Sequence, residues 1–380
     1  MAGSIRVKVA RKVEEIPRGE WDSVFPPCLE NYAFFKSIDE SAFDQFSFYY
    51  IIVYEDGIPV GATSCFLMEF PLDMIVQGPL KGLLDGIKKL LPGIFAPKVL
   101  MCGMPMAQGR MGIAAKNGKA LDMICERMEK IAEEEKASLV IFKDFSHAYD
   151  EQLRPLYRKG FIRIASLPST DMEVRFDSFE EYLKTLSRVS REGIRRKFKQ
   201  VDGKVPIEME AVDALDEGVS SEAYALYLQT FHRQDMGMEK VPRDFFRNVA
   251  RNMPGGVKFF LWRIQGRLVA FAFCLIGDGH FIDYYLGFDY SVSYQYHLYF
   301  VRFRDLMKWC IAAGMRKYEM GVTSYETKRR LGFDFIPLYF YMKHRNPLIN
   351  PFFKLGTCLM KPENFDPVFK EMKKEKAVSA

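Results

Sequence analysis

The chain has 380 residues, of which 48% are hydrophobic and 27% are charged, and its formal net charge at pH 7 is +5. This balance excludes a disordered chain, and the length fits two domains better than one. The small positive charge does not by itself indicate binding to nucleic acid, and we expect no DNA partner.

Cysteine usage and hydropathy predict where the protein works. The seven cysteines form no C-x-x-C pair, which argues against a disulfide framework or a zinc site and favours a reducing cytosol. The first residues lack the apolar core of a signal peptide, and no apolar run reaches the ~18 residues of a membrane span. We therefore expect a cytoplasmic location.

The first half is expected to contain a strand over residues 5–13, two helices, and a long hairpin over residues 46–69 that turns at residues 55–57. A strand over residues 99–106, a helix over 117–136 and further strands follow. The helix carries an apolar stripe at helical spacing, made of Leu121, Ile124, Met128 and Ile131.

Residues 70–98 do not fit this pattern. They form a proline-bounded amphipathic segment whose leucines and isoleucine recur at helical spacing, with lysines on the flanks. The segment is either a helix packed on its own domain, or a lid or membrane-surface anchor whose cations face anionic headgroups at the inner face of the membrane.

The second half begins with a strongly helical pattern over residues 179–199. Besides its apolar stripe it has a basic stripe with spacings of three and four: Arg188, Arg191, Arg195 and Lys199. Such a stripe is either a solvated face or an anion-binding face. With only Glu192 among them, these cations would repel one another and favour a bound anion.

A second hairpin over residues 257–275 turns at residues 265–266 and matches the first in length and character. The two halves of the chain therefore repeat one plan: a strand, two helices, a long hairpin, another strand, a helix and a closing strand-helix-strand.

The strand over residues 280–288 carries several polar side chains and leads through a polar loop into a helix over residues 295–313. Backbone N–H groups at such a helix start favour a phosphate or an oxyanion. Strand alternation predicts Asp283 and Tyr285 on one face and Tyr284 on the other. Asp283, in an otherwise apolar strand, is a candidate general base, and His297 in the first helical turn is a candidate acid or base or a helix cap.

Residues 319–345 form the most informative stretch. A strand end leads into a short helix, for which Thr323 or Ser324 is a suitable N-cap and Gly332 a suitable stop. Tyr325 and Lys328 are three residues apart and share one helix face. The stretch is either a binding or catalytic edge or a capped surface helix with a solvated basic face.

The sequence lacks the motifs of several reaction classes. The five histidines show no metal-ligand spacing, and the chain contains neither a G-x-S-x-G nucleophile motif nor a G-x-x-x-x-G-K-[ST] phosphate loop. We therefore expect no metal and no permanently bound cofactor.

Two motifs carry a family resemblance: Arg191 with residues 194–197, and Tyr325-x-x-Lys328-x-x-x-Gly332. With the hairpin at 257–275 and the segment 282–300, they make residues 170–345 resemble the BioF2-like acetyltransferase domain of the GNAT superfamily. That domain is related to the FemAB-type aminoacyltransferases. The resemblance implies an α+β fold of two tandem GNAT-like (acyl-CoA N-acyltransferase) domains, each a mixed, splayed sheet flanked by helices.

The domains would span residues 1–170, 171–345 and a tail, 346–380. The coenzyme A signature [QR]-x-x-G-x-[GA] is absent in clean form: residues 108–112 are similar but misspaced, and the loop 289–297 has no glycine. This departure disfavours acetyl-CoA and leaves a longer acyl-CoA, acyl carrier protein or aminoacyl-tRNA as donor.

The resemblance implies an N-acyltransferase that moves an acyl group from acyl-CoA or acyl carrier protein, as co-substrate, to a primary amine. The amphipathic insert and the apolar tail favour a lipidic amine, as in bacterial ceramide-type lipid synthesis. The predicted catalytic residues are Asp283, His297, Tyr285 and Tyr325. The predicted donor-binding residues are Lys328, Arg191, Arg195, Tyr294 and Gln295. The alternatives are a FemX-like transferase that uses aminoacyl-tRNA on a cell-wall precursor, and an inactive GNAT-like binding scaffold.

Overall fold

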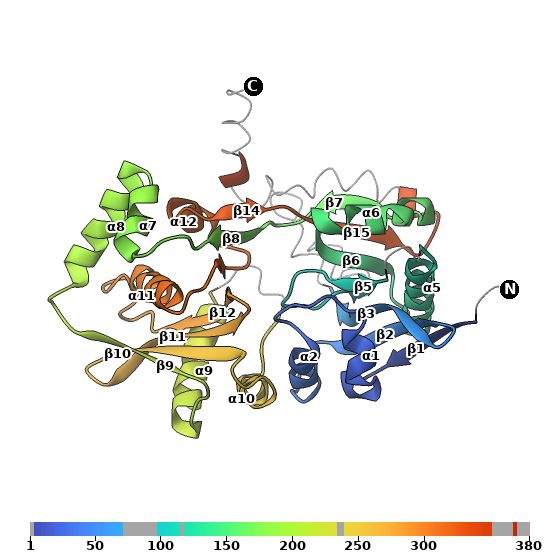
Figure 1. The fold of residues 1–380 in the computed structure, drawn as a ribbon, viewed down its shortest axis with the longest axis horizontal. Helices are drawn as coiled ribbons and strands as arrows, with labels where there is room; N and C mark the ends of the chain where they lie inside the picture. The colour runs from blue at the N-terminus through green and yellow to red at the C-terminus, as the bar shows by residue number, and fades with distance from the viewer. Residues whose placement is uncertain (1–3, 71–96, 115–117, 234–238, 352–367, 371–380) are drawn as a thin grey trace, which may run out of the picture. The chain divides into compact units, whose positions relative to one another are not determined.

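Two units, each with its own sheet and hydrophobic core, make up the computed structural model of the chain (Figure 1). The structure describes residues 4–70, 97–114, 118–233, 239–351 and 368–370. The first unit contains Met1–Asp39, Phe43–Leu167 and Pro337–Ala380, and the second contains Glu40–Ala42 and Pro168–Ile336. Apart from its two ends, the amphipathic segment predicted at residues 70–98 lies outside the described residues.

The sheet of the first unit has the strand order β1-β2-β3-β4-β6-β15-β7, with β5 beside β3. Most neighbours are antiparallel, and β4 and β6 are parallel. Its strands are β1 Ile5–Ala10, β2 Ser47–Glu55, β3 Ile58–Glu69, β4 Lys98–Cys102, β5 Met111–Ile113, β6 Leu139–Ser146, β7 Ile162–Ala165 and β15 Leu338–His344. Its helices are η1 Val13–Glu15, α1 Arg18–Asp22, α2 Tyr32–Asp39, α5 Gly118–Glu134, η3 His147–Tyr149, α6 Asp150–Leu153 and η4 Arg154–Lys159.

Helix α5 covers this sheet with the apolar stripe that its sequence predicts. Leu121, Ile124, Met128 and Ile131 are all buried in the core that includes the inward side chains of β2, β3, β4 and β6. The period of the stripe therefore fixes both the helix and the face that it buries.

The sheet of the second unit has the order β14-β8-β13-β12-β11-β10-β9, in which β12 and β13 are parallel. Its strands are β8 Ser169–Glu173, β9 Ile207–Val212, β10 Val257–Ile264, β11 Arg267–Gly277, β12 His280–Phe288, β13 Lys317–Glu319 and β14 Asp334–Ile336. Its helices are α7 Phe179–Thr185, α8 Arg188–Val201, α9 Glu217–Phe231, α10 Arg243–Asn252, α11 Leu298–Ala312 and α12 Tyr325–Arg330.

Helices cover both faces of this second sheet, as Figure 1 shows for α11 on one side and α9 and α10 on the other. Successive side chains of each strand point to opposite faces of the sheet, so the same strands contribute apolar side chains to the core on each face. In β10, Phe260 packs edge-on against Trp309 of α11, whereas Phe259 contacts Phe246 of α10. We call the two faces the α11 face and the α9/α10 face.

Both predicted hairpins are confirmed, at β2–β3 and β10–β11. Their two-residue turns place both central residues at positive φ, as tight hairpin turns with the twist of a sheet require. These residues are Asp56 (51°) with Gly57 (82°), and Gln265 (50°) with Gly266 (78°).

Strand β15 differs from expectation. We predicted that the second domain runs to residue 345, but the second unit ends at Ile336, and β15 pairs with β6 and β7 of the first unit. The alternating pattern of residues 338–344 predicts a strand, but it carries no information about which sheet the strand joins. Within the described ranges, no helix is long and apolar enough to cross a membrane.

Candidate active site

Strands β12 and β13 part in the middle of the second sheet. Their last pair is Ile282 with Glu319, after which β12 continues to Phe288 while β13 ends. The chain leaves β13 through a turn in which Thr323 and Ser324 both have positive φ, 75° and 52°. We call the parted segments, residues 283–288 and 320–324, the strand split. It is the splayed feature that the predicted fold requires.

A β-bulge at Tyr284 corrects the predicted orientation of Asp283. Tyr285 pairs with Phe273 and Asp283 with Cys274, so Tyr284 is the extra residue of β12. The bulge shifts the alternation by one residue. Asp283 therefore lies on the α11 face, and Tyr285 lies on the α9/α10 face.

On the α11 face, Asp283 belongs to a buried ion pair. Nη1 of Arg302 donates to its two carboxylate oxygens at 2.7 and 2.6 Å, and the two side chains are 0% and 1% exposed. Tyr318 donates a third hydrogen bond, at 3.2 Å. Burial opposes the charge of Arg302, but the Asp283 carboxylate outweighs it and raises the pKa of the guanidinium above its ordinary value. A carboxylate held in this way is a structural counter-ion, poorly suited to accept a substrate proton.

Lys328 and Tyr325 share one face of α12, as predicted, but that face is buried. The Lys328 ammonium donates to three successive carbonyls of the strand split, those of Met320, Gly321 (3.0 Å) and Val322 (3.1 Å). Burial lowers its pKa to about 7, against the carboxylates of Asp283 and Glu319, which raise it.

Tyr325 is 2% exposed and donates to the carbonyl of Pro168 at 2.9 Å. Lys328 therefore holds the turn in place, and Tyr325 ties α12 to the residue before β8.

On the α9/α10 face, the split begins beside an imidazole–carboxylate pair. Nε2 of His280 lies 3.2 Å from Glu319, and their side chains are 24% and 8% exposed. The hydroxyl of Ser169 donates to the same carboxylate at 3.3 Å. The sequence alone does not reveal this pair, because it arises from the parallel register of two strands almost forty residues apart in the chain.

Tyr285 lies further along β12 on this second face. Its hydroxyl donates to Glu239 at 3.1 Å, and its ring contacts Tyr227 of α9 and Phe246 of α10. Burial raises the pKa of Tyr285 well above its ordinary value, so the phenol keeps its proton at neutral pH.

The N-terminus of α11 carries the predicted donor-binding residues. The helix starts at Leu298, three residues later than predicted, and His297 is its N-cap with a φ of 46°. His297 Nε2 lies 2.7 Å from Oε1 of Gln200, and burial together with Lys197 and Lys204 lowers its pKa. Tyr294 is 72% exposed, and Gln295 is also exposed.

The basic stripe of α8 is partly neutralised, which corrects the predicted excess of unopposed cations. Arg195 forms an ion pair with Glu180 of α7 at 2.6 Å, and Arg188 pairs with Glu192 at 2.8 Å. Arg191 donates to the carbonyls of Lys184 and Leu186. Spacing along one helix does not reveal a carboxylate on the neighbouring helix.

In the first unit, β4 and β6 part in the same way, after Cys102 and Phe142. The glycines of residues 108–112 have packing roles here. A Cβ on Gly109 would lie 2.1 Å from the carbonyl oxygen of Lys143, and its N–H donates to Asp144. That N–H is therefore unavailable to a phosphate.

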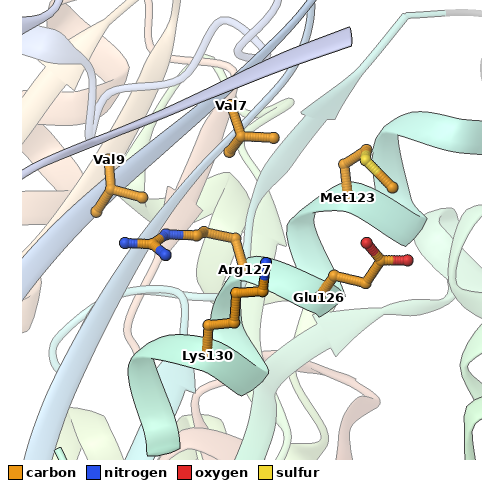
Figure 2. Close-up of a pocket in the computed structure, with 6 residues that line it drawn as sticks. All are labelled: Val7, Val9, Met123, Glu126, Arg127 and Lys130. Carbon is orange, nitrogen blue, oxygen red and sulfur yellow. The ribbon is translucent and has the colours of Figure 1, made fainter. Parts of the chain in front are cut away.

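A hollow of about 360 Å³ also lies in the first unit, between β1 and α5 (Figure 2). Val7 and Val9 of β1 form one side, and the lining from α5 consists of Met123, Glu126, Arg127 and Lys130. It contains none of the predicted site residues. No cluster of three or more histidine, cysteine or acidic side chains suited to a metal occurs in the described part of the chain.

Residues 188–329 match the model of the acetyltransferase (GNAT) domain family. Among solved structures, FemX superposes with a TM-score of 0.54 at 13% identity, covering 90% of this chain and 98% of that one. A tandem GNAT protein from the clavulanic acid biosynthesis pathway superposes with a TM-score of 0.51 at 9% identity, covering 90% and 99%. The second unit thus matches a GNAT acetyltransferase domain over residues 188–329, and the chain as a whole has the fold of FemX and of tandem GNAT proteins.

Among curated proteins, a putative 8-amino-7-oxononanoate synthase 2 of Mycobacterium tuberculosis is 24% identical over 332 residues. The match covers 84% of this chain but only 42% of that protein.

Proposed function

We propose that the chain transfers an acyl group from an acyl thioester to a primary amine at the strand split of the second unit. The observation that carries this proposal is the His280–Glu319 pair at the point where the strands part. A partly exposed imidazole beside a carboxylate is a suitable proton acceptor for an attacking amine.

Glu319 with His280 takes the role of general base that the sequence suggested for Asp283. Tyr285 lies on the same face of the split, and its hydroxyl is the candidate source of the proton that the departing thiolate takes up. Asp283, Lys328 and Tyr325 act as positioning residues. Asp283 and Lys328 each hold one of the two segments that line the split, and Tyr325 ties α12 to Pro168, the residue before β8.

The donor's phosphates bind at the N-terminus of α11. Helix N–H groups, His297, Tyr294 and Gln295 lie there, and Lys197 and Lys204 are close enough to His297 to lower its pKa. Arg191 and Arg195 of α8 bind a more distant anionic part of the donor.

Turnover of thioesters tests this function. The purified chain is incubated with acetyl-, octanoyl- and palmitoyl-CoA, and with acylated acyl carrier protein, together with short and long primary amines. We expect release of free thiol and an amide product of the corresponding mass. Absence of thiol release with every one of these donors would refute the proposed reaction and favour either a binding scaffold or aminoacyl-tRNA as the donor.

We also propose that the acceptor is a long-chain amine at a membrane surface, as in ceramide-type lipid synthesis. The support is the amphipathic pattern of residues 70–98. Removal of these residues should weaken binding to anionic liposomes and slow turnover of a long amine while sparing a short one. Equal binding with and without the segment would contradict the membrane role.

The second candidate donor is aminoacyl-tRNA. Helix α8 favours it, since six of its residues are basic and Glu192 is its acidic residue. Under this alternative, aminoacyl-tRNA and not acyl-CoA would support transfer, and its binding would weaken steeply with salt.

A further inference from the structure

Arg302 leaves half of its guanidinium group unused. It is 0% exposed, and Nη1 makes both contacts with Asp283. Nε and Nη2 have no hydrogen-bond partner among the residues that the structure describes. Their N–H bonds are nearly parallel, the arrangement with which arginine binds oxygen acceptors in pairs. A buried hydrogen-bond donor without a partner lowers the stability of the folded protein. An oxygen ligand at this edge would remove that loss.

A second donor lies beside this edge. Tyr299 precedes Arg302 by one helical turn, and the guanidinium carbon lies 5.5 Å from the centroid of its ring. Its hydroxyl is buried and also has no partner in the described part of the chain. Burial raises the pKa of Tyr299 to about 12, against the opposing effect of Arg302, so the phenol is a hydrogen-bond donor at neutral pH.

These donors belong to the strand split. Asp283, which anchors Arg302, is the first residue of β12 beyond the last pair with β13. They lie on the α11 face, from which the donor's phosphates would be bound, whereas His280 and Glu319 lie on the opposite face. Asp283 cancels the charge of Arg302, so the site suits a neutral oxygen that gains negative charge during reaction.

We propose that the Nε–Nη2 edge of Arg302 and the hydroxyl of Tyr299 bind the carbonyl oxygen of the acyl thioester and stabilise its oxyanion. This inference rests on the proposed acyl transfer and assigns two catalytic residues to it. As the amine nitrogen bonds to the carbonyl carbon, the π electrons move to this oxygen. They return as the C–S bond breaks and the thiolate takes up a proton.

Two tyrosine-to-phenylalanine variants test this assignment. Tyr299→Phe removes a hydroxyl that has no partner among the described residues, so we expect an unchanged or higher Tm. We expect kcat to fall about 100-fold, with KM for the acyl-CoA little changed. The matched control is Tyr182→Phe, whose hydroxyl donates to the carbonyl of Leu331 at 2.8 Å. The control should lower Tm and leave kcat near the wild-type value.

Arg302→Lys gives a second measurement, because lysine keeps the charge opposite Asp283 but lacks the paired N–H edge. Its kcat should also fall about 100-fold in octanoyl-CoA and octylamine assays. If Tyr299→Phe keeps the wild-type kcat, or if its kcat falls together with its Tm, the assignment of Arg302 and Tyr299 is overturned while the proposed function stands. An inactive wild-type protein with all the donors above would instead overturn the proposed function and, with it, this inference.

Discussion

The Asp283–Arg302 pair should dominate the stability of the second unit. Both side chains are fully buried, and the N–O distances are 2.6 and 2.7 Å. Asp283→Asn keeps the shape of the side chain but leaves a buried guanidinium without its counter-charge. Removing one partner of such a pair costs about 3–5 kcal/mol, a large part of the ~5–15 kcal/mol that stabilises a typical domain. We expect Arg302→Met to cost a similar amount, because it leaves the carboxylate unpaired.

The double variant Asp283→Asn/Arg302→Met should cost much less than the sum of the two single variants, because no uncompensated buried charge is left. Urea unfolding followed by tryptophan fluorescence measures this. Two of the three tryptophans, Trp262 and Trp309, lie in the second unit. Single variants within about 1 kcal/mol of wild type, or costs that add, would refute the reasoning.

Three further predictions concern single positions. Lys328→Met should flatten the dependence of stability on pH. The pKa of Lys328 is about 7 in the folded protein and 10.5 ordinarily, so between these pH values the unfolded wild-type chain binds more protons than the folded one. The free energy of unfolding of the wild type therefore rises with pH by up to about 5 kcal/mol relative to the variant. Parallel curves of stability against pH for the two proteins would contradict this. Gly287→Ala should destabilise by about 1–3 kcal/mol or more, because its Cβ would lie 2.5 Å from backbone atoms of Leu226 and Tyr227, whereas Gly193→Ala in α8 meets nothing within 4 Å and should stabilise. Arg195→Ala should change stability by less than about 1 kcal/mol, since its ion pair is exposed, but should raise KM for the acyl donor; an unchanged KM would remove it from the donor site.

Local signals in the sequence predict much of the second unit. Glycine turns fix both hairpins, and Gly332, with a φ of 79°, ends α12 as expected. The spacing of Tyr325 and Lys328 correctly predicts one shared face. It cannot predict that this face is buried, because burial depends on β8 and the turn after β13, which pack against it.

Long-range features could not be predicted from the sequence. The bulge at Tyr284 reverses the face of Asp283 relative to Tyr285, and no turn or proline in the sequence marks it. The His280–Glu319 pair depends on the register of two parallel strands, and β15 joins a sheet whose other strands end at residue 165. Which strands pair depends on packing across the whole unit, and no local pattern in the sequence shows this.

The most direct test of acyl transfer at the strand split compares two glutamine variants of one sheet. Glu319→Gln keeps a hydrogen-bonding side chain beside Ser169 but removes the carboxylate that pairs with His280. Glu173→Gln alters a carboxylate on β8 whose side chain is 66% exposed. We expect kcat for thiol release to fall by a factor of about 10²–10⁴ in the first variant, and to stay at the wild-type value in the second. Equal kcat in Glu319→Gln and wild type would contradict the assignment of the base and of the site.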